Sequence, residues 1–235
     1  MRQTAKSSAT WKHSKQFYKE YVDTDPSVSI ETEGLDEPAR EKMARLFSGV
    51  DQRIMHLSRV LGNQDSFPDN GWYEQILDRF PWINGVAAVD KQGTILVARP
   101  EETIKPQNFD VLLDENEVYG KRTIRARVDE TPFGPEFYMG GPFFNENTLQ
   151  GLVAVHFDFR SLLQFSPAPD DLMVLTEQGI VWPGSGFDEK ALAELPWGEF
   201  LRNDVHGNLK LNKREYYWIS RYVGQMRLIY VVRES

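Results

Sequence analysis

The sequence predicts an α+β fold in which a long N-terminal helix is followed by two tandem antiparallel-sheet modules, the second smaller than the first. Apolar residues recur every three or four positions over one long early segment, and after Pro81 the pattern changes to short β-branched segments separated by turn residues. The order of these short segments occurs twice. We therefore expect a polar leader over 1–35, the long helix with the first module over 36–166, and a second module over 167–235.

The composition is that of a globular protein and excludes several classes. The chain has 235 residues, of which 40% are hydrophobic, and it has no cysteine. Disulfides, cysteine-ligated zinc, iron–sulfur clusters and a thiol nucleophile are therefore excluded. A formal net charge of −8 argues against a nucleic-acid partner, because the phosphate backbone selects a basic surface. No apolar run approaches the roughly 20 residues that a membrane span needs.

The first 20 residues differ in charge from the rest of the chain. They hold five basic residues and one acidic residue, a net charge of +4, so the remainder carries −12. No apolar segment follows these positive charges, and we therefore expect no signal peptide here. A solvated leader that ends near Pro26 is the simpler interpretation; Trp11, Tyr18 and Val22 lie at helical spacing, so a partner-binding helix is the alternative.

The long helix is predicted from Asp36 to the Gly62-Asn63 stop. Pro38 suits its first turn, and one apolar face is indicated by the spacing of Met43, Leu46, Phe47, Val50, Ile54, Leu57 and Leu61. A second, short helix is predicted over 72–80 and ends before Pro81.

Strands follow, beginning with a hairpin over 86–89 and 94–98. Gly93 in the short polar gap supplies the positive φ that a tight turn needs. Three further strands are expected over the ranges 121–128, 136–143 and 151–159, and one or two helical turns over 160–165. The Pro167-Ala168-Pro169 segment is then the best domain boundary in the sequence.

The second module repeats this order on a smaller scale. A hairpin over 172–176 and 180–183 places Gly179 where Gly93 lies in the first hairpin, 86 residues earlier. A helix is expected over 188–200, followed by strands over the ranges 209–211, 216–223 and 226–232.

The alternation of side chains along the strands predicts a ligand pocket in the first module. Each strand has one fully apolar face and one face with a few polar groups, because side chains two residues apart share a face. If the long helix covers the apolar faces, then Arg125, Tyr138 and His156 converge on the other. An apolar concavity with a few polar groups is typical of small-molecule sites, and Arg125 or Arg127 would pair with a carboxylate or phosphate. The alternative is that this face points to water and its charges form surface ion pairs.

Other chemistries have weaker signals. No GxSxG, phosphate-binding loop or dinucleotide motif occurs, so we expect no enzyme and no cofactor. No two histidines have metal-ligand spacing, and we expect no metal site. A hydrolase that uses His156 and Asp158 as a dyad is the catalytic alternative. Trp82, just before the first hairpin, is a candidate lid for the pocket.

The order of these parts resembles the double Cache family of extracytoplasmic sensor domains, whose modules share the PAS-like fold. The resemblance is carried by the long leading helix, INGVAAVDKQGTILVARP at 83–100, GLVAVHFDFRSLLQF at 151–165, DLMVLTEQGIVWPG at 171–184 and YYWISRYVGQMRLIYVV at 216–232. It implies a non-catalytic sensing domain of bacterial signal transduction. The ligand, a carboxylate, amino acid or amine, would lie in the first module, and the second would relay the signal to a membrane-anchored partner. A periplasmic or otherwise extracytoplasmic location is implied as well.

The sequence departs from that family pattern at two places. Amino-acid-binding members tend to carry an Arg and Trp-Tyr cluster before the central strands, whereas the segment from Tyr119 to Val128 has no tryptophan. By register, His156 stands where an aspartate is usual, and Asp158 follows two residues later. These departures leave open a ligand that is not recognised through an α-amino group. The candidate ligand-binding residues are Trp82, Tyr119, Arg125, Arg127, Tyr138, His156 and Asp158. The alternative function is a structural module that forms a homodimer through the long helix and has no ligand.

Overall fold

A computed structural model describes residues 28–29, 37–102, 105, 107–113 and 123–234 of the chain. Most of the predicted leader, including the candidate partner-binding helix, lies outside the described residues, as does Tyr119. Two residues of that leader, Val28–Ser29, form the short strand β1.

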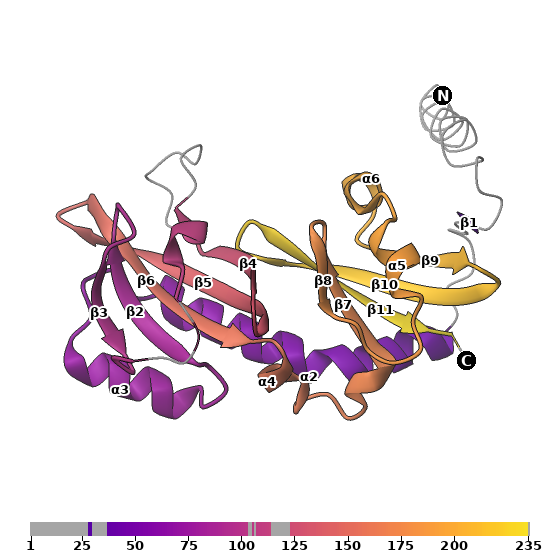
Figure 1. Ribbon diagram of the computed structural model, residues 1–235, viewed down its shortest axis with the longest axis horizontal. Helices are drawn as coiled ribbons and strands as arrows, with labels where there is room; N and C mark the ends of the chain where they lie inside the picture. Colours follow the sequence, from indigo (N-terminus) through magenta and orange to yellow (C-terminus); the bar gives the residue numbers. More distant parts are fainter. Residues whose placement is uncertain (1–27, 30–36, 103–104, 106, 114–122, 235) are drawn as a thin grey trace, which may run out of the picture.

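A single helix, α2 (Glu37–Gly62), runs beside both sheets of the molecule (Figure 1). Its extent confirms the long helix predicted from the apolar spacing. Five of the predicted apolar positions, Leu46, Val50, Ile54, Leu57 and Leu61, have no solvent exposure. Because the apolar stripe continues along the whole helix, one element supplies core residues to both modules.

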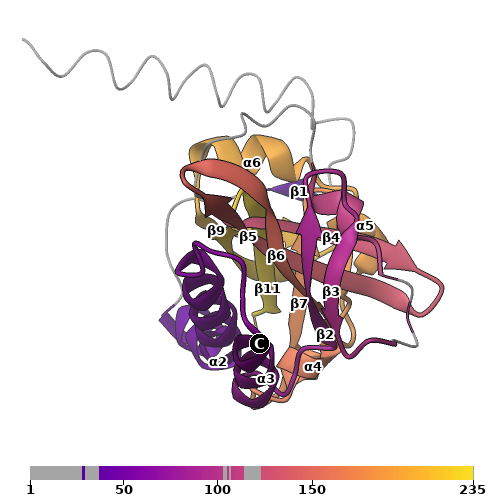
Figure 2. The ribbon, with the colours of Figure 1, turned by 90° about the vertical axis from the view of Figure 1, so that its left-hand side faces the viewer.

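The shorter helix α3 (Asn70–Arg79) lies beside α2 on the same side of the first sheet (Figure 2). It begins where the Asp69 carboxylate accepts a hydrogen bond from the backbone N–H of Trp72, at 2.8 Å. This is an N-cap, and it satisfies a backbone donor that the first turn leaves without a helical partner.

The first sheet has five antiparallel strands in the order β3-β2-β6-β5-β4. Its strands are β2 (Gly85–Asp90), β3 (Ile95–Arg99), β4 (Arg125–Thr131), β5 (Gly134–Asn145) and β6 (Thr148–Asp158). All five strands were predicted, but three of them differ from the expected ranges by more than one residue at an end. β4 spans Arg125–Thr131 where 121–128 was expected, β5 is longer than expected at both ends, and β6 begins three residues earlier than expected and ends one residue earlier.

The two faces of the first sheet are covered by different elements. The predicted apolar face, with Phe137, Met139 and Phe157, packs against α2 and α3. The opposite face carries Tyr138 and is covered by the short 3-10 helix η1 (Phe109–Leu112), which packs on it. The prediction that the long helix covers the apolar faces is therefore confirmed, and the second face is covered as well.

The second sheet has the order β1-β9-β10-β11-β7-β8. Beyond β1, its strands are β7 (Leu172–Thr176), β8 (Gly179–Trp182), β9 (His206–Leu211), β10 (Arg214–Val223) and β11 (Met226–Arg233). The helical turns α4 (Arg160–Leu163) and η2 (Pro169–Asp171) connect it to the first sheet.

One predicted element of the second module is wrong. The expected helix over 188–200 is two helices, α5 (Glu189–Ala193) and α6 (Trp197–Asn203). Pro196 lies between them, and it breaks the helix because proline has no backbone N–H and disfavours helical geometry in the residue before it.

The two modules touch at the turn between β10 and β11. The backbone N–H of Ala126, on β4, donates to Oε1 of Gln225 in this turn, at 3.3 Å. The neighbouring Gly224 has a φ of 60° and lies against the carbonyl of Ile124. The turn of the second module is thus in contact with the edge strand of the first.

Candidate functional site

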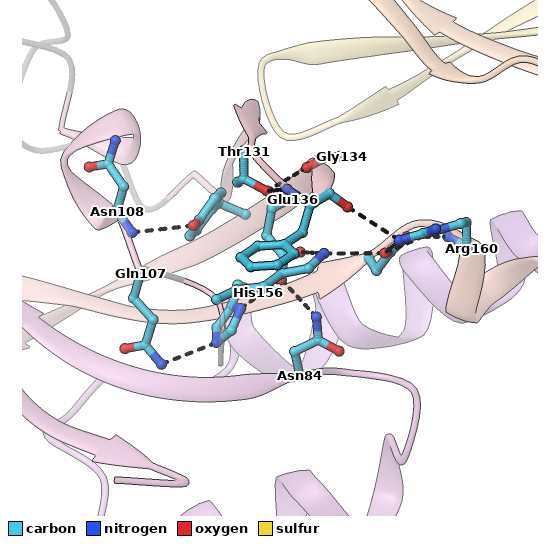
Figure 3. Close-up of polar contacts among 12 residues, drawn as sticks. Asn84, Gln107, Asn108, Thr131, Gly134, Glu136, His156 and Arg160 are labelled. Carbon is cyan, nitrogen blue, oxygen red and sulfur yellow. Dashed lines mark hydrogen bonds and ion pairs between the residues drawn. The ribbon is translucent and has the colours of Figure 1, made fainter. Parts of the chain in front are cut away.

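A group of polar side chains lies on the face of the first sheet that η1 covers, around the two buried residues Glu136 and His156. The strand register places Glu136 opposite Asp158, and Tyr138 opposite His156, on β5 and β6. We call the set Asn84, Lys105, Gln107, Glu136, His156 and Asp158 the Glu136 cluster. Figure 3 labels four of its members, Asn84, Gln107, Glu136 and His156.

Glu136 is the centre of the cluster and has no solvent exposure. Its Oε1 accepts from Nδ1 of His156 at 2.7 Å and from Nδ2 of Asn84 at 2.8 Å, and its Oε2 accepts from Nζ of Lys105 at 2.7 Å. Burial raises the pKa of this carboxyl, but the hydrogen bonds from His156, Lys105 and Asn84 outweigh it and hold the pKa below the ordinary value. Glu136 is therefore a buried carboxylate rather than a neutral acid.

The imidazole of His156 is fixed on both nitrogens. Nδ1 faces Glu136, and Nε2 lies 3.3 Å from the amide nitrogen of Gln107. An amide N–H can only donate, so Nε2 accepts and the proton is assigned to Nδ1. His156 is a hydrogen-bond donor to Glu136 in this arrangement.

Lys105 joins the two carboxylates of the cluster. Its Nζ lies 2.7 Å from Glu136 and 3.2 Å from Oδ2 of Asp158, and the two acids raise the pKa of the ammonium against the opposing effect of burial. Asp158 also accepts from Nε of Arg160 at 2.9 Å. Burial raises the pKa of Asp158, and the bonds from Arg160 and Lys105 lower it below the ordinary value. The alternative of a catalytic dyad between His156 and Asp158 has no support, because the carboxylate that bonds the imidazole is Glu136.

Tyr138 packs beside the cluster. Its ring is stacked on His156 with centroids 6.0 Å apart, and Phe109 from η1 meets it edge-on at 5.6 Å. The hydroxyl accepts from the backbone N–H of Asn108 at 3.2 Å. Burial raises the pKa of this phenol. Tyr138 therefore attaches the η1 segment to the sheet through one polar and one aromatic contact.

The two arginines that the sequence singled out lie on β4, on the same face. Arg125 pairs with Gly140 and Arg127 with Tyr138 in the strand register. Arg125 is buried and donates to the carbonyl of Leu112 at 2.8 Å, while Arg127 donates to the carbonyl of Ala126 at 3.3 Å. The structure thus brings together five of the predicted residues: Arg125, Arg127, Tyr138, His156 and Asp158.

Trp82 is not part of this group. It is buried on the opposite side of the sheet, where its ring lies edge-on to Phe157 at 4.9 Å and to Phe80 at 5.9 Å. Its placement is that of a core residue, because Phe157 belongs to the face that packs against α2. Tyr119 lies outside the described residues.

Neither a metal site nor a membrane-spanning helix is found in the part of the chain that the structure describes. There, no group of three or more His, Asp or Glu side chains could hold a metal ion. The helices there are each too short or too polar to cross a membrane.

The fold was compared with known proteins. No protein-family model matches the chain, and no curated protein matches its sequence. An extracellular ligand-binding receptor from Desulfohalobium retbaense superposes with a TM-score of 0.54 at 16% identity; the match covers 84% of this chain and 38% of the receptor chain. The ligand-binding domain of the Pseudomonas aeruginosa amino acid chemoreceptor PctC, in complex with GABA, superposes with a TM-score of 0.51 at 14% identity. This match covers 84% of this chain and 96% of the PctC domain. The chain has the fold of extracellular sensor domains.

A third sensor domain supports this result over more of the chain. The ligand-binding domain of the Pseudomonas fluorescens chemoreceptor CtaA, in complex with L-serine, gives a TM-score of 0.50 at 10% identity and covers 93% of this chain and 97% of that one. The α+β architecture predicted from the sequence, and its resemblance to sensor domains with tandem modules, are confirmed at the level of the fold. All three matches are sensory domains rather than enzymes.

Sequence reasoning missed four members of the cluster in this sensor fold. Glu136 could have been found, because it has the same strand parity as Tyr138 and lies within a predicted strand. Asn84 comes from the segment before β2, and Lys105 and Gln107 come from the segment between β3 and η1. No periodic pattern indicates where such connecting segments run.

Proposed function

We propose that this chain is a non-catalytic small-molecule sensing domain that holds its ligand in the first module, on the face of β4, β5 and β6 that η1 covers. The observation that carries the proposal is the Glu136 cluster itself. It places charged and amide groups beside a buried apolar cluster made by Ala87, Val89, Leu152, Ala154, Phe109 and Leu112. Small-molecule sites have this composition, mostly apolar with a few oriented polar groups.

The cluster is hard to explain as a device for stability alone. Taking Glu136 and Lys105 out of water costs free energy, and apolar residues of similar volume would hold two elements together as well or better. Buried ionisable groups with shifted pKa values gather at functional sites for this reason. Because the solved proteins with this fold are ligand-binding sensor domains, we expect the cluster to serve binding rather than catalysis.

The ligand class follows from the groups on this face. A carboxylate, an amino acid or an amine would find complementary charges there, with Arg125 and Arg127 as partners for an acid. The neighbours with this fold are described in complex with GABA and with L-serine, which supports a small polar ligand.

The proposed relay runs from this face to the second module. Arg125 and Ala126 are adjacent on β4, and Ala126 bonds to Gln225 in the β10–β11 turn. A ligand that moved β4 would bias that contact, which is a shift between two states with different ligand affinities. We propose residues 36–166 as the ligand-binding part and 167–235 as the relay, in an extracytoplasmic location and with a membrane-anchored signalling partner.

A thermal-shift screen of small acids, amines and amino acids tests the proposal. A ligand at a hundred times its Kd adds about 2.7 kcal/mol of stability, which raises Tm by about 5–10 °C for a chain of this size. Arg125→Gln should remove the response to an acid, whereas Lys190→Ala, at a side chain that is 85% exposed, should keep it. If no compound of any class raises Tm, the proposal is rejected.

The alternative of a homodimer through the long helix is not favoured. The apolar stripe of α2 is used by the two sheets, and the exposed positions include Glu41, Arg45, Gln52, Arg53 and Arg59. A helix pair needs an apolar seam of its own. Sedimentation at several protein concentrations would show a dimer if one forms.

A further inference from the structure

Lys105 reaches the Glu136 cluster from the segment that precedes η1, not from a strand of the sheet. Its side chain is 17% exposed, and its ammonium group lies between two carboxylates, 2.7 Å from Oε2 of Glu136 and 3.2 Å from Oδ2 of Asp158. An ammonium group has three N–H donors and no acceptor. The chain therefore supplies from its own sequence the group that a primary amine ligand would bring.

The remaining oxygens of both carboxylates have other donors. Oε1 of Glu136 accepts from His156 and Asn84, and Oδ1 of Asp158 accepts from the backbone N–H and Nε of Arg160. Oδ2 of Asp158, which faces Lys105, accepts from Nε of Arg160 as well. The two oxygens that face Lys105 are those that a ligand ammonium would have to use. A free amine and Lys105 thus compete for one position.

We infer that Lys105 determines the charge of the ligands that the first module accepts: it fills the ammonium position between Glu136 and Asp158, excludes primary amines, and leaves the site to carboxylates without an amino group. This inference rests on the proposed ligand face. A group held by its own chain has an effective concentration of about millimolar or higher, so a dilute free amine does not displace it. Arg125 and Arg127, on the same face, supply the cations that a carboxylate needs.

This specificity separates the chain from two of the sensor domains that share its fold. GABA and L-serine, with which those domains were solved, each carry both an acid and an amine. With Lys105 in place, the acid of such a ligand has partners on β4, but its amine has no position between the two carboxylates.

Removal of the lysine side chain tests the inference. Lys105→Ala deletes three methylene groups and the ammonium, which is the chemical equivalent of n-propylammonium. We expect n-propylammonium at ten times its Kd to raise the Tm of Lys105→Ala by about 3–6 °C. Wild type and Lys190→Ala should show no rise, and tetramethylammonium, which has no N–H donor, should have no effect on any of the three proteins at the same ionic strength.

A further variant assigns the effect to the carboxylate. Lys105→Ala combined with Glu136→Gln should lose the response to n-propylammonium, because the amide carries no charge to bind it. If Lys105→Ala does not fold unaided, its refolding yield from urea should rise with n-propylammonium and not with tetramethylammonium. Equal responses of wild type and Lys105→Ala, or no response or rescue of Lys105→Ala, would overturn the inference.

Failure of the inference about Lys105 can be distinguished from failure of the proposed sensing function. If wild type responds to GABA or L-serine, the specificity inference is wrong while the sensing function stands. If wild type responds to no compound at all, the sensing function fails, and the response of Lys105→Ala to n-propylammonium still decides whether Lys105 fills an ammonium position.

Discussion

Nδ1 of His156 lies 2.7 Å from Oε1 of Glu136, and both side chains are buried. The two residues are diagonal neighbours on β5 and β6, since Glu136 stands opposite Asp158 and His156 opposite Tyr138. Diagonal positions on one face of a sheet are within reach of long side chains. The register of these two strands therefore creates the pair, and a slip of one residue would turn one of the two side chains to the other face of the sheet.

Glu136→Gln should destabilise the fold. The variant keeps the shape of the side chain but removes the negative charge that Lys105 balances, and the amide NH2 would face a donor where the carboxylate oxygen accepts. Removing one partner of a buried ion pair costs about 3–5 kcal/mol of folding stability. We expect a loss of about 3 kcal/mol in the free energy of unfolding, measured by urea titration with tryptophan fluorescence.

The matched control is Glu215→Gln. Glu215 pairs with Lys210 at 2.6 Å, but both side chains are about half exposed. Exposed pairs contribute little, so this variant should unfold at nearly the wild-type urea concentration. Equal losses in the two variants would show that burial of Glu136 has no energetic consequence.

The stability of the protein should fall in acid because of two carboxyl groups in the cluster. Hydrogen bonds from their partners hold the pKa values of Glu136 and Asp158 below the ordinary range against the effect of burial. A carboxyl whose pKa is lowered on folding adds stability above its unfolded pKa, about 4, and loses it as the pH falls through the folded pKa. The groups that face them are Lys105, His156 and Arg160.

Urea titrations from pH 7 to pH 3 measure this dependence. The free energy of unfolding of wild type should decrease most steeply below pH 4, and Glu136→Gln should show a shallower decrease because one of the two groups no longer titrates. Identical slopes for the two proteins would contradict the prediction.

The fold could be predicted further than the site, for physical reasons. The spacing of residues such as Leu46 and Val50 and the alternation along β5 and β6 are periodic signals, and the structure has these elements where they were expected. Alternation also places Tyr138 and His156 on one face. The partners that complete the site, Lys105 among them, come from a connecting segment with no periodicity.

Trp82, in contrast, was predicted as a site residue and lies in the core. Its position before a hairpin suggested a lid, but an aromatic ring next to the apolar face has more to gain by packing there. Trp82→Ala should cost about 3–5 kcal/mol, the usual range for removing a buried aromatic side chain. The affinity of the folded protein for a ligand found in the thermal-shift screen should not change, as isothermal titration would show. Phe133→Ala, at a side chain that is 52% exposed, is the control and should have little effect on stability.

Gly224 in the β10–β11 turn should be essential for the contact between the modules. It has a φ of 60°, and a Cβ there would lie 2.2 Å from the carbonyl oxygen of Ile124. A left-handed conformation costs a residue with a Cβ about 1–2 kcal/mol, and the contact with backbone adds to that cost because a carbonyl cannot rotate away. We expect Gly224→Ala to lose at least about 2 kcal/mol in urea titration.

Gly179→Ala is the control for this prediction, since Gly179 is the first residue of β8 in the second module and a Cβ there would meet nothing within 4 Å. Hydrogen exchange locates the effect: Gly224→Ala should increase exchange of the Ala126 amide, which donates to Gln225 across the modules, whereas Gly179→Ala should leave it unchanged. If Gly224→Ala keeps wild-type stability and exchange, the turn is not a rigid contact, and a relay from β4 to the second module would need another route. The bond between Arg221 and Asp51, at 3.1 Å, would then be the candidate, because it connects β10 to the helix shared by both sheets.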